Sequence, residues 1–428
     1  MPKSAVATPP RARRARGARR ARGRVEWLLG PALVAGVAYL DPGNVASNMT
    51  AGARFGYLLV WVVVLGNAMA WLIQYLSAKL GVVTGRSLAE TLGDRFRSPW
   101  ARRAYWLQAE LVAMATDIAE VIGGAVALWL LFGVPLPVGG LITGAVSITL
   151  LLVQQRRGAR TFEFVVIGLL AVIAVGFTYG VVAAPPDAAG VAAGLVPRFD
   201  GAESVLLAAS ILGATIMPHA IYAHSALARD RFTAGTARAE DRAVGIRRVL
   251  RATRWDVTIA LVIAGTVNLC ILLLAAANLA GVPGTDSLEG AYAALQHGLG
   301  AVVATLFAVG LLASGLASTA VGAYAGAEIM QGLLRVRVPL LARRLVTLVP
   351  AIAILAAGVD PTWALVLSQV VLSFGIPFAL IPLVTLTARG DVLGAHRNRW
   401  WTTALGVAAS VFLVTLNGVL LWLVLTGG

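Results

Sequence analysis

Asp41 and Asn44 flank the dipeptide Pro42-Gly43, and Asp41 is the only charged side chain between Trp27 and Ala53. A carboxylate within such an apolar segment is costly and points to a functional site. In a soluble protein these four residues would form a turn. Here, splitting the segment would leave two pieces too short to cross a membrane. Because Pro42 has no N–H, we predict that it frees the carbonyl oxygen of Ala38.

A second proline interrupts the apolar segment 204–228, within Gly-Ala-Thr-Ile-Met-Pro-His at 213–219. By the same reasoning, Pro218 should free the carbonyl oxygen of Ala214. Carbonyl, carboxylate and amide oxygens suit hard or borderline divalent cations, and the thioether of Met217 shifts the preference toward transition metals. The C-terminal ends of broken half-helices also favour a cation. The pattern predicts a divided metal site, although Met217 alone would equally suit core packing.

Three acidic residues, Glu110, Asp117 and Glu120, follow a spacing that places them on one face of the helix expected over 104–132. Acids on a membrane helix indicate that this face lines a cavity or a proton route. His219 and His224 in the sixth apolar segment add groups that exchange protons near neutral pH. The alternative for Glu110 and His224 is a position at the aqueous edge, where they would simply be solvated.

The elements that must position these residues are membrane helices. The chain has 428 residues, of which 58% are hydrophobic and 13% charged, and its mean hydropathy is +0.81. These values predict an all-α integral membrane protein. About eleven apolar segments are each long enough to cross the bilayer: 27–53, 57–78, 104–132, 136–153, 162–184, 204–228, 255–279, 297–334, 344–358, 362–387 and 401–426.

The placement of charge supports this layout. With the N-terminus inside, 33 of the 35 basic residues fall on the inner side, with Arg343 and Arg344 assigned to an inner connection. The two exceptions are Arg54 and Arg198. The expected outer connections instead carry acidic residues: Asp187, Asp200, Glu203, Asp286, Glu289 and Asp360. We therefore predict a multi-pass protein of the plasma (inner) membrane with a cytoplasmic N-terminus and an extracytoplasmic C-terminus.

The net charge of +15 comes largely from an Arg-rich tail, predicted as a disordered cytoplasmic segment over residues 1–25. The tail is interpreted as a topology determinant, with binding to anionic lipid, RNA binding or a transit peptide as weaker alternatives. No nucleic-acid partner is needed to explain the charge. Cys270, the only cysteine, excludes an intramolecular disulfide and is interpreted as a packed core thiol.

The two proline breaks occupy comparable positions. The first segment begins near residue 27 and the sixth near 204, and adding 176 to position 41 gives Met217. This offset is expected of an inverted repeat whose corresponding helices are both broken. Within a single transmembrane domain over 26–428, we expect a first repeat at 26–184, a second at 204–387 and an additional helix at 401–426.

Three motifs together resemble the Nramp family of proton-coupled metal transporters, and within it the bacterial manganese transporters. They are Asp-Pro-Gly-Asn at 41–44, Ala-Thr-Asp-Ile-Ala-Glu at 115–120 and Met-Pro-His at 217–219. Weaker similarity lies at 76–81 and 367–376, and the resemblance covers nearly the whole chain after the tail. It implies a LeuT-like inverted repeat, with helices 1–5 and 6–10 as the repeats and helices 1 and 6 broken.

The resemblance also implies roles for individual positions. The metal ligands would be Asp41, Asn44, Met217 and the Ala214 carbonyl, with the Ala38 carbonyl and Gln369 contributing in some states. Proton movement would involve Asp117, Glu120 and His219, with Asp41 serving both ions and Glu110 on the same face. The chain departs from the family pattern at Ala220, where some members have Asn, and at Ala317, where a serine is common. These changes bear on gating and coupling rather than on the ligands.

The function predicted from the sequence is proton-coupled import of divalent transition-metal ions by alternating access, with Mn²⁺ first and Fe²⁺, Cd²⁺ or Co²⁺ not separated from it. The protein would not be an enzyme, would need no cofactor and would have no obligate protein partner; its partners are the lipid bilayer, the metal ions and protons. One alternative is a transporter of organic solutes with the same broken-helix fold. A membrane metalloenzyme is another, although no His-Glu-x-x-His sequence is present.

Overall fold

The structure is a computed structural model that describes residues 31–157, 159–232, 239–336 and 338–426. The predicted basic tail, residues 1–25, lies outside the described residues. Within the described ranges the chain is helical and contains no strand. The helices of the first half are α2 (Pro31–Ala38), α3 (Pro42–Phe55), α4 (Val60–Thr84), α5 (Leu88–Gly93), α6 (Pro99–Phe132), α7 (Leu136–Arg157), α8 (Ala159–Ala183) and α9 (Ala188–Gly194).

The second half begins with another broken helix. Its elements are α10 (Gly201–Thr215), α11 (Pro218–Phe232), α12 (Ala239–Asn278), α13 (Leu288–Leu299), α14 (Ala301–Leu334), α15 (Leu340–Ala356), α16 (Pro361–Ala388), α17 (Gly390–Leu393), the short 3₁₀ helix Gly394–His396 and α18 (Trp400–Thr426). Ten of the eleven predicted apolar segments each correspond to one helix or to one broken pair. Two boundaries were wrong: α12 begins at Ala239 rather than near 255, and the overlong eighth segment is divided between α13 and α14.

Not every one of these segments has the length and hydropathy of an ordinary membrane span. Among the described residues, seven helices satisfy both criteria, with the pair α10 and α11 counted as one. The predicted first segment fails because it is broken into α2 and α3, and α15 has only 17 residues. Interrupted helices at membrane depth are tolerated where protein rather than lipid surrounds them. The least regular segments should therefore lie inside the bundle.

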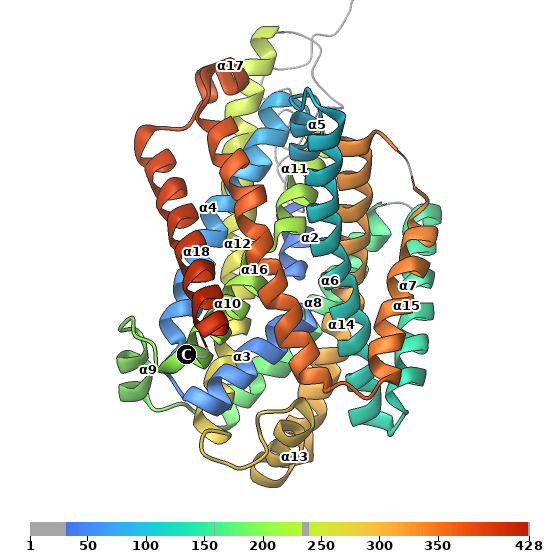
Figure 1. The fold of residues 1–428 in the computed structure, drawn as a ribbon, viewed down its shortest axis with the longest axis vertical. Coiled ribbons are helices and arrows are strands. Elements are labelled where there is room, and N and C mark those ends of the chain that lie inside the picture. The colour runs from blue at the N-terminus through green and yellow to red at the C-terminus, as the bar shows by residue number, and fades with distance from the viewer. Residues whose placement is uncertain (1–30, 158, 233–238, 337, 427–428) are drawn as a thin grey trace, which may run out of the picture.

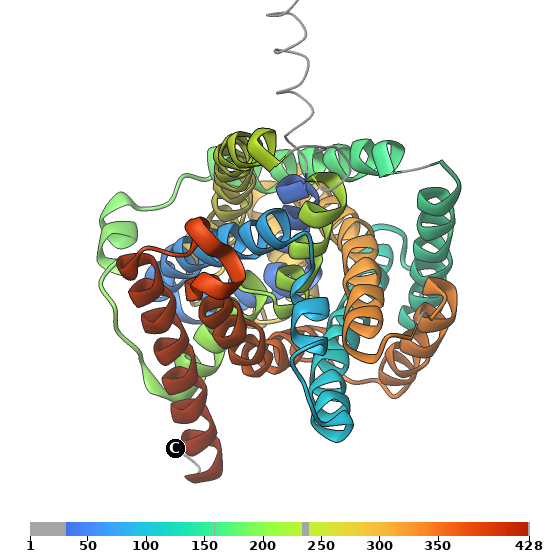
Figure 2. The ribbon, with the colours of Figure 1, turned by 90° about the horizontal axis from the view of Figure 1, so that it is seen from above.

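The arrangement of helices follows this rule. The broken pairs α2–α3 and α10–α11 run through the interior of the bundle, enclosed by α4, α6, α12, α14 and α16 (Figure 1). The apolar helix α18 lies at the rim against α16, and α7 and α15 pack together at the opposite edge (Figure 2). The most buried elements of the molecule are thus the ones that carry the predicted ligands.

The first break is shaped by Asp41, which caps α3. Its carboxylate accepts a hydrogen bond from the Asn44 N–H at 2.7 Å, and Pro42 occupies the first turn, where its missing N–H costs nothing. The prediction that Pro42 frees the Ala38 carbonyl was wrong for this structure. The chain turns after α2, and that oxygen accepts from the Asp41 N–H at 3.2 Å.

Other carbonyl oxygens at this break are satisfied by side chains from distant helices. Asn268 of α12 donates to the Tyr39 oxygen at 2.9 Å, and the Ser314 hydroxyl of α14 donates to the Leu40 oxygen. These groups are buried, so leaving a carbonyl unpaired would cost several kcal/mol. The break is therefore held open by α12 and α14 as well as by its own sequence.

Two glycines bring neighbouring helices close to the break. A Cβ atom added to Gly123 of α6 would lie 2.0 Å from the Pro42 Cβ, and one added to Gly43 would lie 1.8 Å from the Gln369 amide nitrogen. Both distances are far below van der Waals contact. The absence of a side chain at these positions lets α6 and α16 approach the first break directly.

Candidate metal site

The side chain of Asn44 joins the two broken helices. Its amide nitrogen donates to the Asp41 carboxylate at 3.0 Å and to the Ala214 carbonyl oxygen at 2.8 Å. The Ala214 oxygen belongs to the last turn of α10, next to the second break. The carbonyl predicted to be freed by Pro218 thus lies beside the carboxylate and amide of the first break, 170 residues away in sequence.

Gln369 of α16 completes this polar cluster. Its amide nitrogen donates to the second carboxylate oxygen of Asp41 at 3.3 Å and to the Ser368 hydroxyl at 3.1 Å. The cluster is closed to solvent, since Asp41, Asn44 and Gln369 each have 0% of their surface exposed. Sequence pattern alone gave no reason to choose Gln369, which was predicted from the resemblance.

Two oxygens of the cluster have no hydrogen-bond partner. They are Oδ1 of Asn44 and Oε1 of Gln369, both buried. A buried polar atom without a partner is costly, and such atoms mark places where a ligand can bind. Together with the Asp41 carboxylate, these atoms form an oxygen-rich donor set in the interior of the protein.

Met217 follows the end of α10, and its side chain is fully buried, as is Ala214. Among the described residues, no group of three or more His, Cys, Asp or Glu side chains is placed to hold a metal. A site here would instead combine one carboxylate with amide and carbonyl oxygens, to which the sequence prediction adds the thioether of Met217. Such a mixed set suits a borderline divalent ion better than Mg²⁺, which prefers oxygen and water ligands.

The acids of α6 are paired with two arginines of α15. Arg343 donates to Glu110 and to Asp117, both at 2.9 Å. Arg344 donates to Asp117 at 3.2 Å and to Glu120 at 3.3 Å. This buried network therefore contains three carboxyl groups and two guanidinium groups.

The network corrects one expectation from the sequence and rules out one alternative. Arg343 and Arg344 were assigned to an inner connection, but they are buried, with 5% and 1% of their surface exposed. Glu110 and His224 are also buried rather than solvated at an edge, and His224 bonds Gln74 at 2.7 Å. The signal that could have located the arginines is the acidic face of α6, because buried carboxylates require cationic partners.

The network reaches the polar cluster of Asp41, Asn44 and Gln369 through short connections. Glu120 lies one turn before Gly123, which packs directly on Pro42. His219, in the first turn of α11, bonds the hydroxyl of Thr116 at 3.2 Å, and Thr116 precedes Asp117. The structure thus brings the predicted metal residues and the predicted proton residues into adjoining parts of one buried polar region.

A family comparison matches nearly all of this architecture. The family model described as "natural resistance-associated macrophage protein-like", abbreviated Nramp, matches residues 32–423, which include both breaks and the acidic helix. The chain belongs to the Nramp family. This confirms the family predicted from the three motifs.

Curated relatives support the assignment over the full length. The chain is 60% identical over 403 residues to the "Divalent metal cation transporter MntH" of Mycobacterium tuberculosis, covering 94% of this chain and 92% of that protein. It is 46% identical over 393 residues to the protein of the same name from Bacillus subtilis, covering 91% and 90%. These Nramp relatives are named as transporters, and the present chain is accordingly a multi-pass membrane transporter rather than an enzyme.

Solved structures confirm the predicted fold. The manganese transporter of Eremococcus coleocola, solved with an aromatic bis-isothiourea compound, matches with a TM-score of 0.80 at 33% identity and covers 92% of this chain and 85% of that one. MhsT in complex with L-phenylalanine matches with a TM-score of 0.58 at 11% identity, covering 92% and 97%. The second likeness concerns the fold alone, and it agrees with the LeuT-like inverted repeat predicted for this Nramp chain.

The buried network predicts a specific pattern of stability. Replacing Arg344 with Met removes one of two guanidinium groups, which should lower the free energy of unfolding by about 3–5 kcal/mol because buried carboxyls lose their partner. Adding Glu120→Gln removes one of those carboxyls and should restore part of the loss. Thermal unfolding in detergent measures both effects. The exposed Arg335, paired with Asp94, provides the control Arg335→Met, which should change little.

Equal stability of Arg344→Met and the wild type would contradict the network. So would a double variant that is less stable than either single variant.

Proposed function

We propose that this chain imports divalent transition-metal ions, with Mn²⁺ as the main substrate and Fe²⁺ and similar ions as further ones, by proton-coupled alternating access. The observation that carries the proposal is the buried cluster in which Asn44 links Asp41 to the Ala214 carbonyl across both helix breaks. The names of the curated relatives and of the E. coleocola structure support a metal substrate.

The ligands we propose are Asp41, Asn44, Met217 and the Ala214 carbonyl. Gln369 contributes through its unpaired Oε1, and the Ala38 carbonyl contributes in a state in which its bond from the Asp41 N–H is lost. The carboxylate supplies charge, and the ends of α2 and α10 add the negative partial charge of helix C-termini. The Met217 thioether disfavours Ca²⁺ and Mg²⁺ relative to Mn²⁺ and Fe²⁺.

A route to the site starts at the end of the bundle that holds α13. A pocket of about 290 Å³ lies there between α3, α10 and α16, the helices that carry Asn44, Ala214 and Gln369. Acidic residues Glu203, Asp286 and Asp360 line it, and they attract cations. Arg54 bonds both Glu203 and Asp286 and thereby ties α3 to α10 and to the segment before α13. Opening this end would require these ion pairs to separate.

Proton movement is assigned to the network of α6 and α15. Three carboxyl groups face two guanidinium groups, so one added proton brings the group to neutrality. We propose Asp117, Glu120 and His219 as the proton-carrying residues, with Glu110 at the far end and Asp41 serving both proton and metal. The contact between Gly123 and Pro42 gives the network a mechanical connection to the metal site.

The proposed location is the plasma membrane, with the N-terminus cytoplasmic, the C-terminus outside and the α13 end facing outward. This orientation follows the distribution of Lys and Arg along the chain. The division into repeats at 26–184 and 204–387, with 401–426 as an additional helix, stays a prediction.

Asp41 can be tested without losing the helix cap. Asp41→Asn keeps an oxygen that accepts from the Asn44 N–H but removes the charge, and Asn caps helices about as well as Asp. We expect both Asp41→Asn and Asp41→Ala to abolish Mn²⁺ uptake into proteoliposomes. The exposed cap residue Asp187 provides the control Asp187→Ala, which should retain uptake. Full uptake by Asp41→Asn would place the metal site elsewhere.

Met217→Ala should weaken discrimination between metals. The variant keeps the oxygen ligands, so it should still transport Mn²⁺ while becoming more sensitive to competition by Ca²⁺. Competitive uptake with increasing Ca²⁺ measures the change. Met49, a buried methionine of α3, supplies the matched control Met49→Ala. If both variants discriminate as the wild type does, the thioether is not a ligand.

Proton coupling predicts a response to an imposed pH gradient. With the outside acidic, Mn²⁺ uptake into vesicles should rise several-fold and should fall back when a protonophore collapses the gradient. Asp117→Asn should reduce the response while leaving Mn²⁺ binding by calorimetry in place, because Asp117 belongs to the network and not to the ligand set. If Mn²⁺ uptake by the wild type does not change with the imposed pH gradient, proton coupling is excluded.

A further inference from the structure

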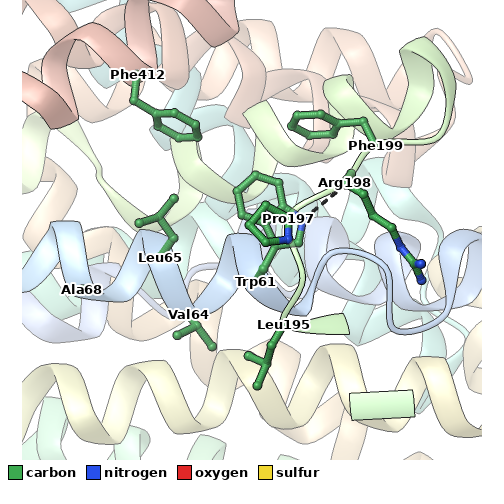
Figure 3. A pocket seen from close by; sticks show the side chains of 9 residues that line it. All are labelled: Trp61, Val64, Leu65, Ala68, Leu195, Pro197, Arg198, Phe199 and Phe412. Carbon is green, nitrogen blue, oxygen red and sulfur yellow. Dashed lines mark hydrogen bonds between the residues drawn. The ribbon is translucent and has the colours of Figure 1, made fainter. Parts of the chain in front are cut away.

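An apolar pocket lies on the outer surface of the bundle, away from the metal site. It has a volume of about 630 Å³ and is formed by α4, the connection between α9 and α10, and α18. Trp61 and Phe199 meet edge to face in it, with ring centroids 5.4 Å apart, and Leu65 and Phe412 complete one side (Figure 3). Arg198 lies on the opposite side of Trp61 from Leu65 (Figure 3). The pocket is thus apolar at one end and basic at the other.

The pocket runs along the axis of a membrane helix. Its lining includes Trp61 at the start of α4 and Ala68 seven residues later, which corresponds to about 10 Å along the helix. Phe412 lies midway along α18, so the apolar part extends from the end of the bundle toward the middle of the membrane. The side chains of Val64 and Phe199 are 45% and 42% exposed. This shape and direction match those of a lipid acyl chain.

A second, polar hollow of about 500 Å³ adjoins the pocket and shares Arg198 and Phe199 with it. Its charged lining residues are Arg54, Arg198 and Asp200. Arg54 already pairs with Glu203 and Asp286. Within the described part of the chain, Arg198 and Asp200 form no ion pair with each other or with another residue. One cation and one anion are therefore available to a ligand.

These features together select one kind of occupant. We propose that the two hollows bind a phosphatidylethanolamine molecule, with an acyl chain in the apolar pocket, the phosphate on the Arg198 guanidinium and the ammonium on the Asp200 carboxylate. An arginine guanidinium recognises phosphate by charge-assisted hydrogen bonds. A primary ammonium can donate to a carboxylate, whereas the trimethylammonium of phosphatidylcholine cannot donate a hydrogen bond.

Charge balance argues for this headgroup over an anionic one. Phosphatidylglycerol would satisfy Arg198 but would bring no cation to Asp200, which lines the same hollow. The two residues proposed to bind the headgroup, Arg198 and Asp200, lie outside the ligand cluster and the acidic network. It would hold the connection that leads into α10, which begins at Gly201 directly after Asp200.

Native mass spectrometry of the full chain tests the proposal. The detergent-purified protein is mixed with equal amounts of phosphatidylethanolamine, phosphatidylcholine and phosphatidylglycerol of the same acyl chains, and retained lipids are counted. We expect preferential retention of phosphatidylethanolamine. Arg198→Gln should reduce it at least about fivefold, and Asp200→Asn should remove the preference over phosphatidylglycerol while leaving phosphate-dependent binding. Leu65→Trp, which fills the apolar pocket, should reduce retention of all three lipids.

The control is Arg103→Gln, because Arg103 is also exposed and lies 5.4 Å from the ring of Trp100, away from both hollows. It should retain lipid as the wild type does, and unchanged thermal unfolding would show that each variant is folded. Unaltered retention by Arg198→Gln overturns the proposal, and so does a wild-type preference for phosphatidylglycerol. A dimer that Leu65→Trp dissociates, in place of bound lipid, would assign the pocket to a second copy of the chain and would also overturn it.

Discussion

A broken helix inside a membrane protein leaves backbone groups that neither water nor lipid can satisfy, and this constraint governs the centre of the structure. The break between α2 and α3 meets it with side chains from three sources. Asp41 caps α3, Asn268 of α12 bonds the Tyr39 carbonyl, and Ser314 of α14 bonds the Leu40 carbonyl. The break is thereby fixed in position relative to two long helices, and the carboxylate of Asp41 is held where the second break can reach it.

The same atoms serve stability and the proposed function. Asn44 uses its amide nitrogen to connect Asp41 with the Ala214 carbonyl, which closes the gap between the two breaks and leaves its own oxygen unpaired. Gln369 of α16 donates its amide nitrogen to Asp41 and also leaves its own oxygen unpaired. In the proposed mechanism, a cation competes with these amide nitrogens for the carboxylate and carbonyl oxygens and gains the unpaired amide oxygens. Loading would then replace one set of links between the breaks by another, which is how binding can shift the balance between conformations.

A feature of the fold or of the candidate site could be predicted from the sequence when the residues that determine it are close together in the chain. Proline and an isolated carboxylate are visible in a short segment, so both helix breaks were predicted correctly. The roles of Asp41 and Asn44 as metal ligands stay a prediction. The hydrogen bond to the Ala38 carbonyl was not predicted. The prediction assumed a helix that kinks at Pro42, whereas α2 ends before it, and the turn that follows lets the Asp41 N–H donate to this oxygen. Asn268 and Ser314 carry no local signal, since their partners are more than 200 residues away.

Arg343 and Arg344 show a different limit of sequence reasoning. Rules for charge in membrane proteins count arginines as cytoplasmic, and these two stand at the edge of an apolar segment, so the rule assigned them to a connection. Burial of a guanidinium is favourable only when carboxylates and hydrogen-bond acceptors meet it with good geometry. Glu110, Asp117 and Glu120 provide the charge, and Ser147 and Thr319 accept further bonds from Arg344. Burial of the acids of α6 therefore depends on the arginines of α15, and burial of the arginines depends on the acids.

That pairing also explains how the acidic helix can lie so close to the proposed cation site. Three uncompensated carboxylates beside Asp41 would repel it and one another, while full neutralisation by arginine would leave no group to receive a proton. The network has two guanidinium groups for three carboxyl groups, so its negative charge is largely but not fully compensated. Gly123 and Gly315 bring α6 and α14 against Pro42. Glu120 lies one helical turn before Gly123, so a shift of α6 at Glu120 would move atoms that contact the first break. In the proposed function, this excess of one carboxyl group and the packing of α6 against the first break are what link proton movement to metal movement.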